Sequence, residues 1–166
     1  MRTRYHYFGF AIALAILCGC DRPTEGPDAA VTPATPAFPE WVAPYLGRNI
    51  AEVFALDSDT CTGFANPADP NEQFTEATGV RVDGWGWSIT NERAYSRIVA
   101  TDDAGIIQGA GDGGFARPDV PQAMRDITDP NTGYSIVTRS TSGTVSVFGI
   151  DEANHTACRI GGRVLS

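Results

Sequence analysis

Two tryptophans and an arginine–aspartate pair are the residues whose types and spacing could support ligand binding. Trp85 and Trp87 are two residues apart, so on a β-strand their side chains would lie on the same face. If that face is exposed, they form an aromatic platform that stacks on sugars or apolar ligands. If it faces inward, they belong to the core. Arg117 and Asp119 flank Pro118, where they either contact a ligand or form a salt bridge and a helix cap.

Cys61 and Cys158 are the second informative pair. The chain has four cysteines, of which Cys18 and Cys20 belong to the amino-terminal segment considered below. If that segment directs export, Cys61 and Cys158 are the one remaining pair, which indicates one disulfide. This bridge would close a loop of about 100 residues, worth on the order of 4–5 kcal/mol in the chain-entropy model. A metal site is disfavoured, because His155 and Cys158 do not make a ligand cluster by themselves.

A glycine-rich stretch, Gly109–Gly114, formally matches the dinucleotide-binding pattern G-x-G-x-x-G. Such a site also needs a helix that begins at the last glycine, so that its N–H groups meet the pyrophosphate. The segment Phe115-Ala116-Arg117-Pro118 follows instead, and we interpret the glycines as a flexible or bulged turn. We expect no nucleotide cofactor.

No segment predicts a catalytic or metal centre. Asp57-Ser58-Asp59 resembles the start of a calcium loop, but Cys61 and Thr62 stand where a third acid and a glycine are needed. No Gly-x-Ser-x-Gly elbow is present, and His155 has no identifiable nucleophile. We therefore expect a protein without metal or cofactor that is not an enzyme, with a small carboxylate-dependent hydrolase as the least favoured alternative.

The amino terminus resembles that of bacterial lipoproteins. Arg2 and Arg4 precede an apolar run of about ten residues, which is too short to span a bilayer and typical of a secretory signal. The run ends in Leu17-Cys18-Gly19-Cys20, which resembles a lipobox. The resemblance implies that Cys20 is acylated, becomes the first residue of the mature chain and binds the lipid bilayer.

Two alternatives for this segment are a plain secretory signal and an amino-terminal transmembrane helix. Asp21, Arg22 and Pro23 end the apolar run early, and Leu17-Cys18-Gly19 fits a small-x-small cleavage site poorly. Asp21 also resembles the inner-membrane retention signal of enteric bacteria. We expect a protein anchored to the cell membrane that faces the periplasm or the cell exterior.

The charge balance excludes some partners. The 166 residues carry 12 basic and 20 acidic side chains, and the basic residues are all arginine. Removal of residues 1–19 would take away Arg2 and Arg4 and no acid, leaving a net charge of about −10. An acidic, lysine-free surface argues against nucleic acid and anionic lipid as partners.

Three regions follow from these patterns: a signal peptide over 1–19, a lipid anchor and disordered Pro-rich linker over 20–40, and a folded domain over 41–166. The linker is punctuated by Pro23, Pro27, Pro33, Pro36 and Pro39.

The folded domain is predicted to be all-β. Short runs of strand-like residues recur at about ten-residue spacing, which favours a single jelly-roll-like antiparallel β-sandwich. Strands over 133–138 and 144–150 are expected to pair, and Gly161-Gly162 is expected to separate two strands. One short helix is expected over 120–126, with Asp119 as its N-cap. Residues 49–56 fit a helix capped by Asn49 or a strand.

Several segments together resemble a module of bacterial envelope proteins and of accessory regions in large glycosyltransferases. The resemblance implies a β-sandwich without catalytic residues and makes a glycan role conceivable. The matching segments are Cys61-Thr62-Gly63, Gly84-Trp85-Gly86-Trp87, the strand and turn over 99–107, Arg117-Pro118-Asp119-Val120, Gly133-Tyr134 and Cys158.

We therefore expect a lipid-anchored, non-catalytic binding or assembly module that contacts an envelope protein or glycan. The alternative is a carbohydrate-binding module, with Trp85 and Trp87 as the stacking platform and Arg117 and Asp119 as polar contacts.

Overall fold

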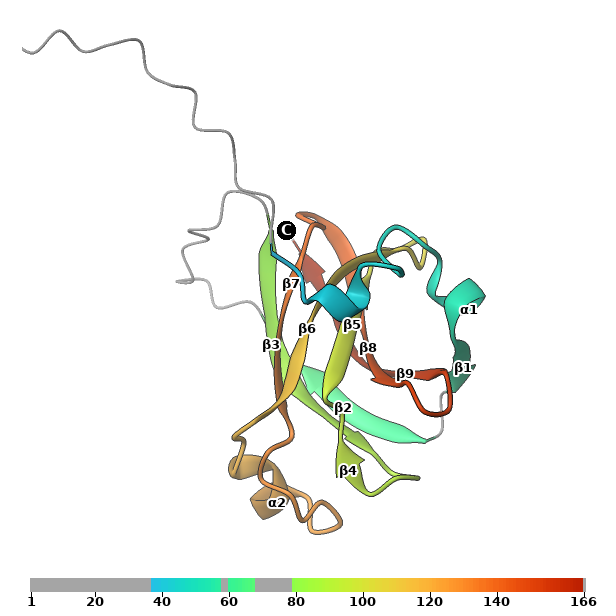
Figure 1. Ribbon diagram of the computed structural model, residues 1–166. Coiled ribbons are helices and arrows are strands. Elements are labelled where there is room, and N and C mark those ends of the chain that lie inside the picture. The colour runs from blue at the N-terminus through green and yellow to red at the C-terminus, as the bar shows by residue number, and fades with distance from the viewer. Residues whose placement is uncertain (1–36, 58–59, 68–78, 166) are drawn as a thin grey trace, which may run out of the picture. The chain divides into compact units, whose positions relative to one another are not determined.

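The computed structural model describes residues 37–57, 60–67 and 79–165. Within them, nine strands form one curled, mixed sheet (Figure 1). The strands are β1 (Ala55–Asp57), β2 (Cys61–Ala65), β3 (Val80–Ser88), β4 (Arg93–Ala94), β5 (Arg97–Thr101), β6 (Ile107–Phe115), β7 (Gly133–Thr138), β8 (Gly143–Asp151) and β9 (Thr156–Leu165). A 3-10 turn, η1 (Glu40–Val42), and two short helices, α1 (Ile50–Val53) and α2 (Asp119–Ala123), accompany them. The prediction of an all-β domain is confirmed.

The strand order is β1-β9-β8-β5-β6-β7-β3-β2, with β4 paired to the end of β3. Neighbours are antiparallel except for β1 and β9, which run parallel. Hydrogen bonding therefore joins all nine strands in one sheet and does not divide them into the two sheets expected of a sandwich. The expected pairing of β7 with β8 is wrong: β7 pairs with β3 and β6, whereas β8 pairs with β5 and β9.

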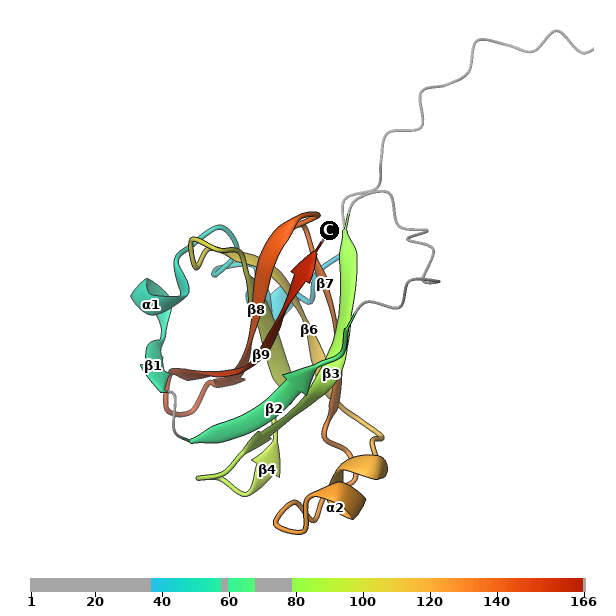
Figure 2. The same ribbon diagram turned by 180° about the vertical axis from the view of Figure 1, so that it is seen from behind.

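The curl brings β2 back against β9, as both views show (Figures 1 and 2). The predicted disulfide joins Cys61 of β2 to Cys158 of β9, with 6.1 Å between the Cα atoms. Gly63 allows the close approach, because a Cβ there would lie 2.7 Å from the Cβ of Ile160. The two strands are thus held together by a covalent bond and by direct backbone packing.

The concave face of the sheet encloses the main core. Glycines on the strands leave room for large side chains that come from other parts of the chain. Gly86 faces Ile160, Gly84 lies beneath the ring of Tyr134, and Gly149 lies beneath the ring of a second buried tyrosine, Tyr95. Burial is the main cause that raises the pKa of Tyr134, whose hydroxyl donates a hydrogen bond to the carbonyl of Phe64 at 3.2 Å.

The convex face is covered in two places. Residues 38–54 pack over β5, β6, β8 and β9 around Val99, Phe148 and Ile150. Backbone hydrogen bonds attach this segment to the start of β6 at Ile107. The guanidinium of Arg97 lies over the ring of Trp41 at 5.1 Å. Elsewhere on this face, α2 covers the end of β3.

The local predictions for helices are partly confirmed. Residues 49–56 contain both conformations: the Asn49 side chain accepts a hydrogen bond from the N–H of Ala51 at the start of α1, and β1 follows. Among the described residues, the short helix expected near residue 120 is present as α2, and α1 is a second short helix. The N-cap role expected of Asp119 is wrong, because Pro118 precedes α2 as its cap and Asp119 is the first helical residue.

Two glycine-rich segments are strands and not turns. Gly109–Gly114 lies inside β6, and Gly161-Gly162 lies inside a continuous β9. A Cβ at Gly161 would lie 2.7 Å from the backbone nitrogen of Ala65. Most of these glycines serve close packing between strands, which a sequence pattern does not distinguish from chain reversal. Gly114 is the exception: its φ is 94°, no atom lies within 4 Å of a Cβ placed there, and the register of β6 shifts at this residue, so the expected bulge is present. Among the described residues, no helix is long and apolar enough to cross a membrane.

Replacement of both bridged cysteines, C61S/C158S, is expected to lower the free energy of unfolding by about 4–5 kcal/mol, because the bridge closes a loop with a sequence separation of 97. Urea unfolding of the full-length protein measures the loss. The wild type treated with a reductant that opens the bridge is the matched control and should unfold at the same urea concentration as the variant. A variant as stable as the oxidised wild type would contradict the role assigned to the bridge.

Candidate functional site

Three aromatic side chains form a row across the convex face. Residues that pair directly across strands point to the same side of a sheet. Phe64 of β2 pairs with Trp85 of β3, Trp85 pairs with Gly133 of β7, and Gly133 pairs with Phe115 of β6. We call Phe64, Trp85 and Phe115 the aromatic row. Phe64 and Phe115 are each 52% exposed, and Trp85 is partly buried.

Trp87 does not contribute to this surface. It is 5% exposed and packs with Val120 and Ile127 beneath α2. Of the two alternatives for these tryptophans, the core position therefore holds for Trp87, and a platform made by both is wrong, although the two side chains do share the convex side of β3. The spacing of two residues predicts the shared side, but the segment that covers one end of the strand decides which tryptophan meets solvent.

A pocket of about 260 Å³ opens beside the aromatic row. Gly133 creates part of this hollow, because a Cβ at that position would lie 2.9 Å from Cγ of Arg117 and 3.2 Å from Cβ of Phe115. The pocket therefore occupies space that a larger residue at the middle of the row would fill. Its lining residues are Asn66, Asp83, Gly84, Phe115, Arg117, Gly133, Tyr134 and Ser135.

Arg117 is held against Asp119 by two hydrogen bonds. Nε donates to Oδ1 at 2.9 Å and Nη2 donates to Oδ2 at 2.8 Å. This contact is the main cause that raises the pKa of Arg117 and lowers the pKa of Asp119. The salt bridge considered from the sequence is present, and the pair offsets its own charge. Arg117 lines the pocket, and the exposed Asp119 fixes its guanidinium from outside.

Three polar side chains of the pocket have no hydrogen-bond partner among the described residues: Asp83, Asn66 and Ser135. Asp83 and Ser135 pair across β3 and β7, next to the aromatic row. Asp83 is the one carboxylate among the residues that line the pocket. Acid–base hydrolysis of a glycosidic bond uses two carboxyl groups, so this lining does not supply that machinery.

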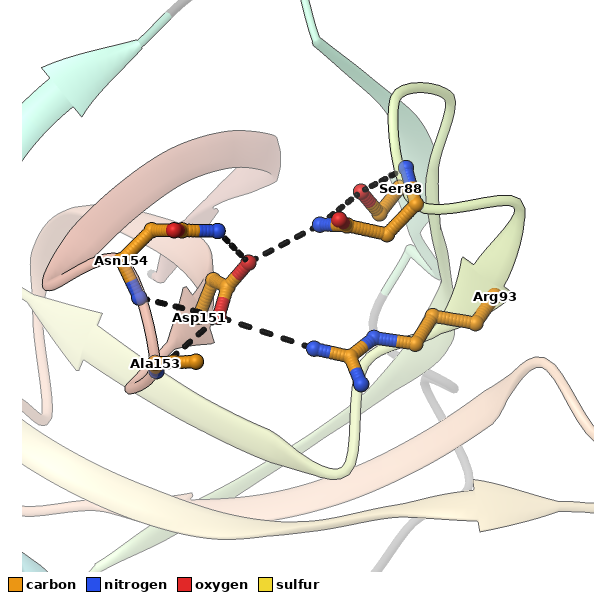
Figure 3. A network of polar contacts seen from close by, with 6 residues as sticks. Ser88, Arg93, Asp151, Ala153 and Asn154 are labelled. Atoms are coloured by element: carbon orange, nitrogen blue, oxygen red, sulfur yellow. Dashed lines mark hydrogen bonds and ion pairs between the residues drawn. The ribbon is translucent and has the colours of Figure 1, made fainter.

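Asp151 forms a second polar cluster, which the sequence analysis did not identify (Figure 3). Its side chain is 6% exposed and accepts hydrogen bonds from the side chains of Asn91 and Asn154, each at 2.9 Å. The N–H groups of Ala153 and Asn154 donate to its other oxygen. The carboxylate thus ties the turn after β3 to the turn after β8, and its acceptor sites are occupied by the protein itself.

The hydrogen bonds around Asp151 change its acidity. Burial by itself would raise the pKa, but the donors from Asn154, Asn91 and Ala153 together lower it. Arg93 lies 3.5 Å away and is exposed, so this ion pair adds little. Ser88 accepts two hydrogen bonds from Asn91 and links the cluster to the core. The Asp151 carboxylate therefore holds the two turns together, and because its oxygens accept these hydrogen bonds it is not available as a catalytic base.

Other sequence candidates have defined positions. Cys158 is bonded to Cys61, and His155 packs against Phe54 with 5.0 Å between ring centroids. In the part of the chain that the structure describes, no three His, Cys, Asp or Glu residues gather to hold a metal. Cys20 and the lipobox lie outside the described residues, as do Ser58 and Asp59 of the calcium-like segment.

Comparison with known proteins yields no relative: no family model, curated protein or solved structure matches this chain.

The two tryptophans of β3 should differ in their effect on stability. Trp87→Ala is expected to lower the free energy of unfolding by about 3–5 kcal/mol, because it empties a buried site beneath α2. Trp85→Ala is the matched substitution on the same strand and should cost about 1–2 kcal/mol, since its ring is already partly in water. Urea unfolding measures the free energy of unfolding of both variants. An equal decrease in the two variants would refute the assignment of Trp87 to the core.

Asp151→Asn is expected to lower the free energy of unfolding by about 1–3 kcal/mol at neutral pH, because an amide NH₂ would face donors where a carboxylate accepted. The folded-state pKa lies below the ordinary value of 3.8, so the contribution of Asp151 is full above about pH 4 and is lost as the pH falls through that lower pKa. Wild type and variant should therefore converge in acid. Asp126→Asn, at an exposed position, is the control. A difference that is constant with pH would show that the carboxylate's charge is not responsible.

Proposed function

We propose that this protein is a lipid-anchored envelope protein whose β-domain is a non-catalytic binding or assembly module, and that its binding surface is the aromatic row with the adjoining pocket. The observation that carries the proposal is the exposure of Phe64 and Phe115 beside free polar groups. Large exposed aromatic side chains gathered around a pocket are typical of surfaces that bind another molecule.

The anchoring part of the proposal rests on the amino-terminal sequence. Acylation of Cys20 would attach the mature chain to a membrane, and Asp21 favours retention at the inner membrane. The Pro-rich segment that follows would separate the domain from the bilayer by roughly 3 Å per residue if fully extended. The domain would then reach an envelope partner while it remains tethered.

The partner is an envelope protein or a glycan. An extended glycan or a peptide could lie along the aromatic row, where planar rings provide apolar area and the pocket provides directional hydrogen bonds. A carbohydrate ligand is the second candidate, supported by the combination of aromatic rings with an aspartate and an asparagine that have free hydrogen-bonding capacity. A hydrolase is not proposed, since the pocket lining contains a single carboxylate.

Cys20→Ala is expected to release the protein from membranes, because the chain would lose its acyl acceptor. Fractionation of cells that express the tagged full-length protein measures the release, and mass spectrometry of the amino-terminal peptide detects the acyl chains. Cys18→Ala is the matched control and should remain in the membrane fraction. Persistent membrane attachment of Cys20→Ala would instead indicate an uncleaved amino-terminal helix.

In-cell photo-crosslinking tests the surface. A photoreactive residue placed at position 64 or 115 of the tagged protein should capture a specific partner, whereas the same residue at position 56 should not. Leu56 is a suitable control because it is 54% exposed and lies on β1, outside the aromatic row. Adducts are identified by mass spectrometry of both peptides and glycans. Equal capture at all three positions, or none at 64 and 115, would contradict the proposal.

A further inference from the structure

We infer that the pocket binds one pyranose ring that carries no negative charge, presented at the end of a glycan. This inference rests on the binding role proposed for the aromatic row, and it names the class of ligand. Three properties of the pocket lead to it: its size, the distribution of its polar groups, and its charge.

The size of the pocket fits a small ligand. Its volume of about 260 Å³ is below the roughly 300–1,000 Å³ of sites that enclose drug-sized molecules. One six-membered sugar ring is a ligand of this scale, whereas a peptide helix or an oligosaccharide would not enter as a whole. A longer glycan would therefore insert one terminal ring and continue outside, where Trp85 and Phe64 extend the aromatic surface.

The polar and apolar groups of the pocket are separated in a way that matches a pyranose. Such a ring has an apolar C–H face and a rim of hydroxyl groups. Phe115 provides the aromatic surface for the C–H face. Asp83, Asn66 and Ser135 lie on the lining, and within the described residues their side chains make no hydrogen bond, so their donors and acceptors are available to hydroxyl groups. Each pair of neighbouring hydroxyls needs both a donor and an acceptor, and a carboxylate next to an amide supplies them.

The charge of the pocket selects against an acidic sugar. Arg117 donates hydrogen bonds from Nε and Nη2 to the two carboxylate oxygens of Asp119, so its positive charge is offset by this ion pair. Asp83 has no such counter-ion within the pocket lining. The remaining charge is negative, as is that of the whole chain at −8. A uronate or a phosphorylated sugar would meet repulsion, whereas a neutral or N-acetylated hexose would not.

Ligand-observed saturation-transfer NMR tests the inference with the full-length protein in detergent micelles. The probes are methyl glycosides of neutral hexoses, a deoxyhexose, N-acetylhexosamines and hexuronates. We expect binding of at least one neutral or N-acetylated glycoside, with the transfer concentrated on ring C–H protons, and about tenfold weaker binding or none for the matching uronate.

Variants locate the site. Phe115→Ala should weaken binding of the neutral glycoside by about tenfold or more, because its exposed ring is the aromatic wall. Asp83→Asn should reduce the ratio between the affinity for the neutral sugar and the affinity for its uronate by about three- to tenfold, because the repelling carboxylate is removed. Leu56→Ala and Glu52→Gln are the matched controls at exposed positions outside the pocket, and neither should change binding. Thermal unfolding of each variant checks that the fold is retained.

Each remaining outcome overturns the inference in a distinguishable way. Equal binding of uronate and neutral sugar would remove the charge argument, and neutral binding unaffected by Phe115→Ala would place the site elsewhere. No binding of any probe together with protein crosslinks at positions 64 and 115 would show that the aromatic row binds a protein, so that only the sugar is wrong. The absence of both sugar binding and crosslinks would overturn the proposed function as well.

Discussion

The contact between β2 and β9 holds the sheet in its curled form. Without it, β2 and β1 would be two distant edges of one sheet, and the concave face would open to water. The disulfide between Cys61 and Cys158 fixes one point of the contact, and Gly63 permits the backbone approach that continues it. A covalent link suits this position, because β2 and β9 lie far apart along the chain and the entropy lost in closing long loops is large.

The interior enclosed by this closure is packed by pairing glycines with large side chains. Rings and branched side chains fill space that would otherwise be backbone surface, because each lies over a glycine from elsewhere in the sheet. These side chains are Tyr95, Tyr134 and Ile160. Such packing reaches high density with few residues, but it leaves little tolerance at the glycines. It also explains why glycine is frequent in strands of this chain, although glycine normally weakens them.

The convex face then divides into covered and open parts. Residues 38–54, which include α1, cover one part, and α2 covers the end of β3. The aromatic row lies on the part of this face between them that neither segment covers. The position of α2 is coupled to the pocket, since Arg117 is bonded to Asp119 at the start of this helix. The same short helix therefore buries Trp87 and orders one wall of the pocket. The helix α2 therefore contributes both to the stability of the domain and to the candidate binding surface.

The sequence by itself determined the β content, the Asn49 cap and the proximity of Arg117 and Asp119, because each depends on spacing or on neighbours along the chain. It also determined the disulfide, because Cys61 and Cys158 are the one pair of cysteines outside the amino-terminal segment. The tertiary structure alone decided that the sheet is single and mixed, that Trp87 is buried, and that Phe64, Trp85 and Phe115 lie in one row beside the pocket that Asp83 lines. These depend on the register between strands that are distant in sequence. A local sequence pattern does not predict this register. The register is set by which side chains fill the space opposite each glycine once the sheet has closed.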